Sequence, residues 1–353
     1  MGEAEALFPH HAHDGTGFAR SMQRCQCSYE FAMIHGAKIA VFYDLTIYNL
    51  QFMHDQDEKY MRRCLQLARH GAFTTAPNPM VGAVIVHEGR IIGEGWHRRY
   101  GGPHAEVNAV RSVRPEDEAL LPHSTIYVSL EPCSHWGKTP PCAELLVEKG
   151  FRRVVVGCLD PNEKVAGRGI TRLREAGVEV IVGVLEDECR WLNRKFMTFH
   201  ALRRPYITLK WAESADGFID RHRESREKDG DAVKFSTPWT QMLVHRLRAL
   251  HEAILVGRRT WELDQPSLTT RLWPGKSPEK LVLSASGKPL AESIKPFQSI
   301  LVEGGAQTLQ SFIDADLWDE VFIERSEIVL NDGIQAPKMK TDPKGCPVHV
   351  NFA

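Results

Sequence analysis

The chain has 353 residues, and its 44 lysines and arginines nearly balance its 45 aspartates and glutamates, for a formal net charge of −1. At roughly 100–200 residues per domain, this length predicts about two domains, and the balanced charge excludes extended binding of nucleic acid or of an anionic membrane through bulk charge. Apolar residues make up 42% of the chain, enough for folded cores, and no apolar run reaches the roughly 18 residues that span a membrane.

The first 52 residues are rich in histidine and aromatic side chains and show no clear periodicity. We expect residues 1–52 to be an extension without a fold of its own, and the first domain to begin near Met53. The extension lacks the basic segment and apolar core of a secretory signal, and eight cysteines are too few for a disulfide scaffold in this chain. The sequence therefore favours a cytoplasmic protein.

Residues 53–199 show a regular alternation of helices and strands. Apolar side chains at helical spacing predict a first helix that ends at Gly71: Tyr60, Met61, Cys64, Leu65 and Ala68. After it we predict strands over 80–86, 91–95, 124–130, 153–157 and 179–183, with a turn at 88–89 between the first two. Further helices are predicted over 104–110, 142–149, 169–176 and 186–199. This alternation implies a first domain with a sheet covered by helices.

Residues 200–205 (HALRRP) are polar, basic and end in proline, and we interpret them as a linker. A second α/β domain is predicted over 206–353, with strands at 206–211, 253–257, 280–283, 299–302 and 320–323. A charged loop is expected at 221–231. Thr237 and Pro238 predict the start of a helix that runs to residue 248, and a further helix is predicted over 304–313.

Three short motifs in the first predicted domain supply one imidazole and two thiols. His104 lies in Pro-His-Ala-Glu, Cys133 in Glu-Pro-Cys and Cys142 in Pro-Pro-Cys. One histidine and two cysteines form the ligand set of a catalytic zinc, which keeps a fourth position for water. Zinc lowers the pKa of its bound water to about 7, and Glu106 would then act as general acid/base and carry a proton to the leaving ammonia.

The spacing of His104 and Glu106 requires the start of a helix. Positions i and i+2 do not share a helical face, so they converge only where a helix begins, and Pro103 places them there. Pro141 likewise puts Cys142 at a helix start, where the dipole favours a thiolate. Alone, each ligand would be an ordinary buried side chain, but the joint pattern favours a metal. A structural zinc is disfavoured because a fourth ligand at matching spacing is missing.

The second predicted domain contains a glycine pair, Gly304-Gly305, between an apolar strand and a helix. Backbone N–H groups at such a helix start can face a phosphate, and glycine lets the phosphate approach closely. The pair is weak evidence alone, because such pairs are usually turn or cap residues. There is no G-x-G-x-x-G motif, so a standard Rossmann domain is not indicated.

The zinc motif is close to the H-x-E…P-C-x-x-C signature of zinc nucleobase deaminases, but eight residues rather than two separate Cys133 and Cys142. The resulting PCSHWGKTPPC, with Ala76–Gly82 (APNPMVG) and Gly95-Trp96-His97, resembles the bifunctional deaminase/reductase family of riboflavin biosynthesis (the RibD family) over about Met53 to Asp332. The resemblance implies a cytidine-deaminase-like three-layer α/β/α domain followed by a dihydrofolate-reductase-like α/β domain.

The resemblance also implies roles for residues of the first domain. His104, Cys133 and Cys142 match the zinc ligands, and Glu106 matches the proton shuttle. Four residues match positions that hold the pyrimidine and its ribose phosphate: Asn78, His97, His135 and Lys138. A plain Asn-Pro turn and a solvated loop lysine are the alternative interpretations of Asn78 and Lys138.

In the second domain the family reduces a ribosyl group to ribityl with NADPH, and Lys210 matches a position at that site. Substrate-contacting positions match Arg248, Leu268, Arg271 and Glu303. Cofactor-contacting positions match Glu213, Lys234, Thr260, Asp264, Gly305, Ala306, Gln307, Thr308 and Leu309. The chain departs from the family where a Ser and a Trp are usual in G-x-S-x-W, because Ala232 and Lys234 stand there.

The leading hypothesis is a cytoplasmic riboflavin-biosynthesis enzyme with two activities. A zinc-dependent hydrolytic deaminase acts on a pyrimidine ribosyl phosphate, and an NADPH-dependent reductase then acts on the ribosyl group. We expect a homo-oligomer, a dimer or tetramer, and the neutral charge and the lack of a long apolar run argue against nucleic acid and membrane as partners. Three alternatives stay open: a deaminase whose degenerate second domain serves binding or dimerisation, a nucleic-acid deaminase, which the neutral charge argues against, and a non-enzymatic zinc module.

Overall fold

The computed structural model of the chain describes residues 55–136, 140–162, 166–283, 293–339 and 348–352. The predicted extension over 1–52 and the substrate candidate Lys138 therefore lie outside the described residues. Lys59–Ala353 belong to one unit, which contains two large sheets.

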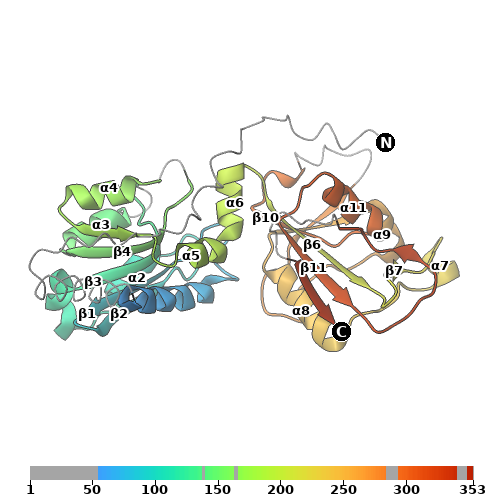
Figure 1. The fold of residues 1–353 in the computed structure, drawn as a ribbon, viewed down its shortest axis with the longest axis horizontal. Coiled ribbons are helices and arrows are strands. Elements are labelled where there is room, and N and C mark those ends of the chain that lie inside the picture. Colours follow the sequence, from blue (N-terminus) through green and yellow to red (C-terminus); the bar gives the residue numbers. More distant parts are fainter. Residues whose placement is uncertain (1–54, 137–139, 163–165, 284–292, 340–347, 353) are drawn as a thin grey trace, which may run out of the picture. The chain divides into compact units, whose positions relative to one another are not determined.

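The first sheet consists of five strands: β1 (Gly82–His87), β2 (Arg90–Trp96), β3 (Thr125–Leu130), β4 (Arg153–Cys158) and β5 (Glu179–Val182). They lie in the order β2-β1-β3-β4-β5 (Figure 1). β1 pairs antiparallel with β2 and β3, whereas β3, β4 and β5 run parallel. The predicted turn between β1 and β2 is confirmed, with left-handed backbone at Glu88 (φ 47°) and Gly89 (φ 80°).

Helical segments cover both faces of this sheet: residues 55–68, η1 (Arg69–Gly71), α2 (Ala105–Arg111), η2 (Pro115–His123), α3 (Cys142–Glu148), α4 (Arg168–Glu175) and α5 (Glu186–Leu192). Alternate side chains of β1 point to the two opposite faces of the sheet. Ala83 and Ile85 join a core with α2, α3 and α4, while Val84 and Val86 join a core with helix 55–68 and α5. The predicted three-layer α/β/α arrangement is confirmed, although the short helix η2 was not expected.

The helix predicted over 186–199 is two helices, because α5 ends at Leu192 and α6 (Arg194–Leu202) begins after Asn193. The buried Asn193 side chain accepts a hydrogen bond from the Met80 backbone N–H and donates one to the Met80 carbonyl, both at 2.8 Å. An amide committed to a distant segment favours a helix boundary over a helix interior. α6 extends into the predicted linker, so that residues 203–205 join it to the next strand.

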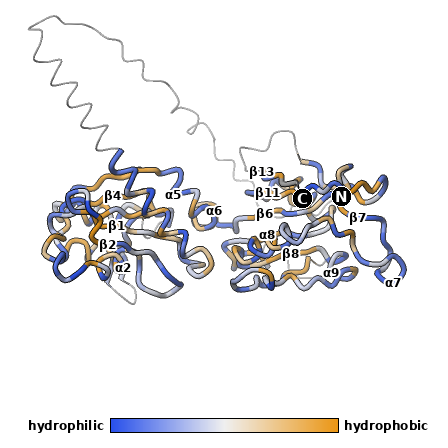
Figure 2. Tube along the Cα trace, turned by 90° about the horizontal axis from the view of Figure 1, so that it is seen from below, coloured by the Kyte–Doolittle hydropathy of each residue, from blue (hydrophilic) through white to orange (hydrophobic). Residues whose placement is uncertain are grey.

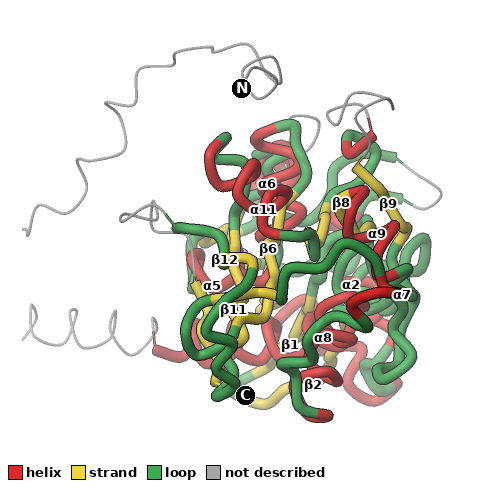
Figure 3. The backbone as a smooth tube through the Cα atoms, turned by 90° about the vertical axis from the view of Figure 1, so that its right-hand side faces the viewer, coloured by secondary structure: helices red, strands yellow, loops and turns green. Residues whose placement is uncertain are grey.

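The second sheet has six parallel strands: β6 (Tyr206–Glu213), β8 (Ala253–Gly257), β9 (Glu279–Leu283), β10 (Ser299–Val302), β11 (Glu320–Arg325) and β13 (Val348–Phe352). Their order is β13-β11-β6-β10-β8-β9. Every neighbouring pair is parallel. β7 (Phe218–Asp220) and β12 (Ile334–Gln335) form a separate ribbon that the sequence did not predict. In Figure 3 strands are yellow and helices are red, and β6, β8, β9 and β11 of this sheet are labelled.

The helices that accompany the second sheet in the described part of the chain include α7 (Arg226–Asp229), α8 (Pro238–Ala249), α9 (Arg258–Asp264) and α11 (Ala306–Asp314). Buried residues of α11 pack on one face, with Leu209 and Val302, and residues of α8 and α9 pack on the other, with Ile254 and Leu301. Thr237 caps α8 as predicted, since its hydroxyl accepts the N–H of Thr240 at 3.2 Å. Among the described residues, no helix has the length and hydropathy of a membrane span.

The charged loop predicted over 221–231 contains one helical turn, α7, which the sequence analysis did not expect. The hydroxyl of Ser225 caps this turn by accepting the N–H of Lys228 at 3.2 Å. Figure 2 shows α7 as a hydrophilic segment and β8 as a hydrophobic one. A capped polar turn needs no buried face, which is why hydrophobic periodicity could not reveal it.

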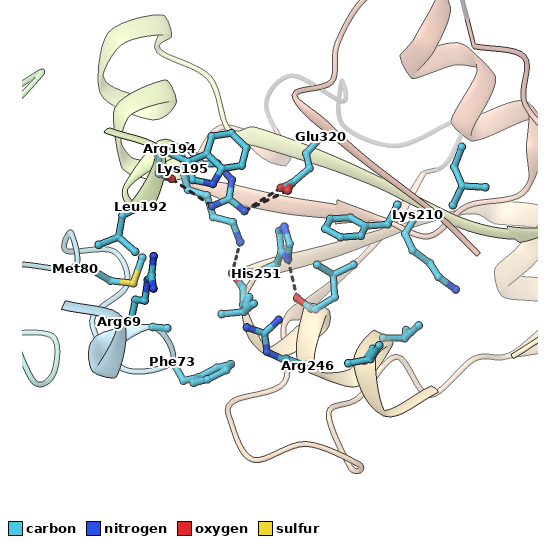
Figure 4. A pocket seen from close by; sticks show the side chains of 18 of the residues that line it. Arg69, Phe73, Met80, Leu192, Arg194, Lys195, Lys210, Arg246, His251 and Glu320 are labelled. Carbon is cyan, nitrogen blue, oxygen red and sulfur yellow. Dashed lines mark hydrogen bonds and ion pairs between the residues drawn. The ribbon is translucent and has the colours of Figure 1, made fainter. Parts of the chain in front are cut away.

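α6 and the end of α8 meet at a cluster of buried polar contacts (Figure 4). The Lys195 ammonium donates to the Leu250 carbonyl at 2.5 Å, and Arg194 pairs with Glu320 at 3.1 Å. His251 Nδ1 lies 2.8 Å from the Leu247 carbonyl oxygen, and Nε2 lies 2.9 Å from the Thr208 hydroxyl. Because a carbonyl only accepts, Nδ1 carries the proton and Nε2 accepts from Thr208. Burial lowers the pKa of this neutral histidine well below its usual value.

This neutral histidine predicts a loss of stability at acid pH. Below the unfolded pKa of about 6.5 the unfolded chain binds a proton that folded His251 does not, so the free energy of unfolding falls by up to about 1.4 kcal/mol per pH unit. His251→Asn retains a donor for the Leu247 carbonyl and removes the titration. When the pH is lowered from 7.5 to 5.5, the free energy of unfolding measured with urea should therefore fall by about 1.4 kcal/mol less in the variant than in the wild type. Equal losses in the two proteins would contradict the assignment.

Candidate functional site

The three predicted zinc ligands converge in the first domain. His104 is the extended residue before α2, Cys133 follows β3, and Cys142 is the first residue of α3. His104 Nδ1 lies 3.5 Å from Cys133 Sγ and 3.3 Å from Cys142 Sγ, and all three atoms lie within 4.8 Å of one another. One nitrogen and two sulfur donors in this cluster fit zinc, which favours such ligands and needs a fourth, open position for catalysis.

Glu106 reaches the same cluster from the first turn of α2. It is 3% exposed, and its carboxyl group lies close enough to His104 and Cys133 for their charges to affect its pKa. Burial raises the pKa of Glu106 to about 7. A carboxyl group with a pKa near neutrality can both take up and release a proton, as general acid/base catalysis requires. The predicted helix start, which lets His104 and Glu106 converge, is confirmed.

The two thiols are in different protonation states in this protein-only cluster. Hydrogen bonds from the Cys142 thiol, from His104 and from the Cys142 backbone N–H lower the pKa of Cys133 to about 4. The pKa of Cys142 is raised by its hydrogen bond to Cys133 and by burial. The hydrogen bond with Cys133 raises the pKa of His104 to about 9. Binding of a metal by all three groups therefore displaces protons from His104 and Cys142.

Two of the predicted pyrimidine-binding residues lie beside the cluster. Asn78 Nδ2 is 3.1 Å from His97 Nε2, and His97 Nδ1 is 3.0 Å from the Pro103 carbonyl oxygen. Nδ1 therefore carries the proton and Nε2 accepts from Asn78. The His97 ring meets the His104 ring edge-on, with centroids 5.6 Å apart, and burial lowers the pKa of His97. The structure thus brings Asn78 and His97 together beside the zinc ligands.

The loop after Cys133 carries the other two candidates. His135 and its neighbour Trp136 are exposed, and His135 lies close enough to Asp160 to help to hold the pKa of that carboxyl down. Burial is the larger effect, and it raises the pKa of Asp160 to about 6. Lys138 lies outside the described residues, so its predicted contact with phosphate stays a prediction.

Glu131 is a site residue whose function the sequence analysis missed. Its buried carboxylate accepts three backbone N–H groups, from Gly167 and Gly169 at 3.0 Å and from Asp160 at 3.3 Å. It therefore ties the segment between β4 and α4 to the end of β3, two residues before Cys133. The Glu-Pro-Cys motif was the available signal, but the partners lie 29 to 38 residues away in sequence.

In the second domain two predicted substrate residues form a buried ion pair. Arg248 Nε and Nη2 donate to the two carboxylate oxygens of Glu303 at 3.0 and 2.6 Å. Burial alone would raise the pKa of Glu303, but Arg248 and nearby Lys210 lower it. Arg248 also donates to the Thr269 carbonyl at 3.2 Å, which places the loop that carries the other two candidates beside the pair.

Those other two candidates differ in accessibility. Arg271 is exposed and donates to the Ser267 hydroxyl at 2.7 Å. Leu268 is only 2% exposed and packs in the core on the α8 face of the sheet, with Ile254 and Leu301. Because its side chain is buried in this core, any contact of Leu268 with substrate would have to come through its backbone.

The predicted cofactor residues around α11 are partly brought together. Thr260 of α9 accepts the backbone N–H of Gly305 at 3.1 Å, and Gly305 is the residue before α11. Ala306, Gln307 and Thr308 form the first turn of this helix. Leu309 is fully buried in the core, where its side chain contacts other protein residues. The N–H groups of positions 306 and 307 at the start of a nine-residue helix fit the phosphate of a dinucleotide.

The remaining cofactor candidates are separate from this helix start. Asp264 pairs with the buried Arg223 at 2.7 Å, and Glu213 pairs with Arg325 at 2.6 Å. Lys234 is exposed. The contacts that the structure gives to Asp264 and Glu213 are therefore structural ion pairs, and their roles toward a cofactor stay predictions.

Comparisons with known proteins connect both domains to one family. A family model described as the cytidine and deoxycytidylate deaminase zinc-binding region matches residues 54–158, and the RibD C-terminal domain matches residues 205–296. The riboflavin biosynthesis protein RibD of Aquifex aeolicus is 35% identical over 326 residues, covering 79% of this chain and 89% of its own length. The Escherichia coli K12 protein is 44% identical over 216 residues, covering 61% of this chain and 56% of its own length.

Solved structures agree with these relationships. A deaminase/reductase from Thermotoga maritima, named for diaminohydroxyphosphoribosylaminopyrimidine and 5-amino-6-(5-phosphoribosylamino)uracil, superposes with a TM-score of 0.72 at 36% identity, covering 80% of this chain and 90% of that one. Acinetobacter baumannii RibD superposes with a TM-score of 0.71 at 29% identity, covering 82% of this chain and 92% of that one. The chain therefore belongs to the RibD family of riboflavin biosynthesis proteins, with a deaminase domain followed by a reductase domain.

Proposed function

We propose that this chain catalyses two consecutive steps on one pyrimidine ribosyl phosphate. The deaminase domain hydrolyses the 2-amino group of 2,5-diamino-6-ribosylamino-4(3H)-pyrimidinone 5′-phosphate. The reductase domain then uses NADPH to convert the ribosyl group into ribityl, which gives 5-amino-6-ribitylaminouracil 5′-phosphate. The observation that carries the proposal is the convergence of His104, Cys133, Cys142 and Glu106 in a chain whose second domain is that of the same family.

In the first step, bound zinc would supply an activated water as the nucleophile. Glu106 takes one proton from the attacking water and delivers it to the 2-amino group, which leaves as ammonia while the water oxygen stays on the ring carbon. A pKa of about 7 supports this exchange in both directions at neutral pH. Asn78 and the neutral His97, which adjoin His104, provide polar atoms that would orient the pyrimidine ring.

In the second step, bound NADPH would supply a hydride to C1′ of the ribosyl group, while the C1′–O4′ bond breaks and O4′ takes a proton from solvent to become a hydroxyl of the ribityl group. The start of α11 offers backbone N–H groups for a cofactor phosphate, and Thr260 fixes the entry to that helix through Gly305. Arg248 has much of its donor capacity committed to Glu303 and Thr269. The exposed Arg271 is therefore the better placed of the two arginines to meet the substrate phosphate.

We further propose that the chain works as a homo-oligomer in the cytoplasm. The thiols of Cys64, Cys158 and Cys189 are free and buried, which is typical of proteins kept in a reducing compartment. Size-exclusion chromatography with light scattering tests the oligomeric state directly.

Glu106→Gln separates the two activities. The amide cannot exchange a proton with water, so ammonia release should fall by about 10²- to 10⁴-fold. NADPH oxidation with the deaminated intermediate should be unchanged, because that reaction belongs to the other domain. Glu118→Gln, an exposed substitution in η2, is the matched control. Normal ammonia release by Glu106→Gln would contradict the assignment of Glu106, and an absence of NADPH oxidation in the wild type would favour a deaminase with a degenerate second domain.

Zinc uptake should release protons, since His104 and Cys142 are both protonated at neutral pH in the protein-only cluster. Titration calorimetry of the metal-free protein with zinc should show heats that vary with the ionisation enthalpy of the buffer and an affinity that rises with pH. The Cys158→Ala control, which removes a buried thiol outside the cluster, should behave as the wild type. Zinc binding with no proton release would show that these groups are not the ligands.

A further inference from the structure

The carboxyl edge of the second sheet contains a topological switch point between β8 and β10. These two strands are neighbours and run parallel, so their carboxyl ends lie side by side. The helix that follows β8, α9, packs on one face of the sheet, and the helix that follows β10, α11, packs on the other. In open α/β sheets, ligands bind outside the carboxyl ends of the strands at such a point. The topology therefore favours a ligand at the starts of α9 and α11.

Arg223 is bonded to both ends of α9. Its guanidinium donates from Nη2 to the carboxylate of Asp264, the last residue of this helix, at 2.7 Å. Its backbone carbonyl accepts Nη2 of Arg259, in the first turn, at 2.7 Å. Between these two contacts, Thr260 accepts the backbone N–H of Gly305, the residue before α11. Arg223 thus holds the helix that in turn holds the start of α11.

The Arg223 side chain is also bonded to its own loop. It is 3% exposed. Nε donates to Asp220 Oδ2 at 2.7 Å, and the other oxygen of Asp220 accepts the Val233 N–H at 3.1 Å. Nη1 donates to the Gly230 carbonyl at 3.4 Å. The guanidinium therefore joins the beginning and the end of the 221–231 loop to α9.

No apolar anchor holds this loop in place. Residues 221–231 are all described, and Arg223 is the only one of them that is buried. The short helix α7 within the loop has no buried residue. Because a buried charge is stable only with partners, the ion pairs of Arg223 decide where the loop lies.

We propose that Arg223 is a positioning residue of the reductase domain, which shapes the NADPH site by joining the 221–231 loop to α9. Thr260 and Asp264 of α9 match cofactor positions of the family, and the loop leads directly to a third, Lys234. A planar guanidinium suits this role, because it bonds two carboxylates in fixed directions. This inference rests on the reductase function proposed above and adds to it a determinant of cofactor affinity.

Arg223→Gln removes the charge that joins the loop to α9. The loss of hydrogen bonds to charged groups predicts a rise of about 10- to 100-fold in the KM for NADPH. The KM for the deaminated intermediate, the kcat of reduction and the rate of deamination should stay within twofold of the wild type. Arg226→Gln is the matched control, because it breaks an exposed ion pair with Asp231 inside the same loop. A lower melting temperature with an unchanged KM for NADPH would show a purely structural role and overturn the proposal.

Asp264→Asn and the double variant test whether Arg223 acts through Asp264. The single substitution should raise the KM for NADPH at least threefold. Substitutions of two residues in direct contact are not additive, so the double variant should match the worse single variant within twofold. An unchanged KM in Asp264→Asn, or a KM in the double variant equal to the product of the two single effects, would overturn the proposal.

If Arg223→Gln fails to fold, Arg223→Lys keeps the buried charge but lacks the fork that bonds Asp220 and Asp264 together. A KM for NADPH that is raised at least threefold in this variant supports the proposal, and an unchanged one overturns it. Calorimetric titration with NADPH in the absence of substrate separates the two levels of inference. A wild-type chain that does not bind NADPH would contradict the reductase function and this proposal together, whereas equal affinities of the wild type and Arg223→Gln would overturn the role of Arg223 alone.

Discussion

The close packing of helix α2 against the edge hairpin is the constraint on which the deaminase site depends. A Cβ added to Gly95 of β2 would lie 2.3 Å from the backbone nitrogen of Ala109 and 2.6 Å from the carbonyl oxygen of Ala105. Only a residue without a side chain allows backbone and helix to approach so closely. This contact fixes the beginning of α2, so that His104 and Glu106 face the thiols of Cys133 and Cys142. The chemistry thus depends on a contact that contains no reactive atom.

The two domains position the side chains of their sites in different ways. In the deaminase domain the ligands are the residue before α2, the first residue of α3 and a residue after β3, and the backbone geometry of these segments brings their side chains together. In the reductase domain the α8 face of the sheet carries opposite charges, with Arg248 bound to Glu303 and Lys210 beside Glu324. Buried charges of this kind are stable only with partners. Each of these charges is therefore positioned by another charge.

Sequence patterns predicted the features that local physics determines. Hydrophobic spacing predicted a first helix ending at Gly71, and Pro103 and Pro141 predicted the helix starts that bring the zinc ligands together. Contacts between distant segments decided the rest. Asn193 divides a predicted helix because its amide binds Met80, 113 residues away. Leu268 matches a substrate position, but its side chain is part of the core. The hydrogen-bond partners of Glu131 and Glu324 could not be predicted from sequence patterns, because they lie far from these residues in sequence.

The unequal protonation of the two thiols has a consequence for the handling of the protein. Without a metal, the low pKa of Cys133 keeps it ionised at neutral pH, and the protonated Cys142 thiol is its hydrogen-bond partner. A thiolate is the form of cysteine that oxidants attack, and a neighbouring thiol can then resolve the product into a disulfide. Bound zinc would engage both sulfurs and suppress this reaction. Bound zinc would therefore also protect the two thiols, and after its loss in air a disulfide between them would have to be reduced before zinc could bind again.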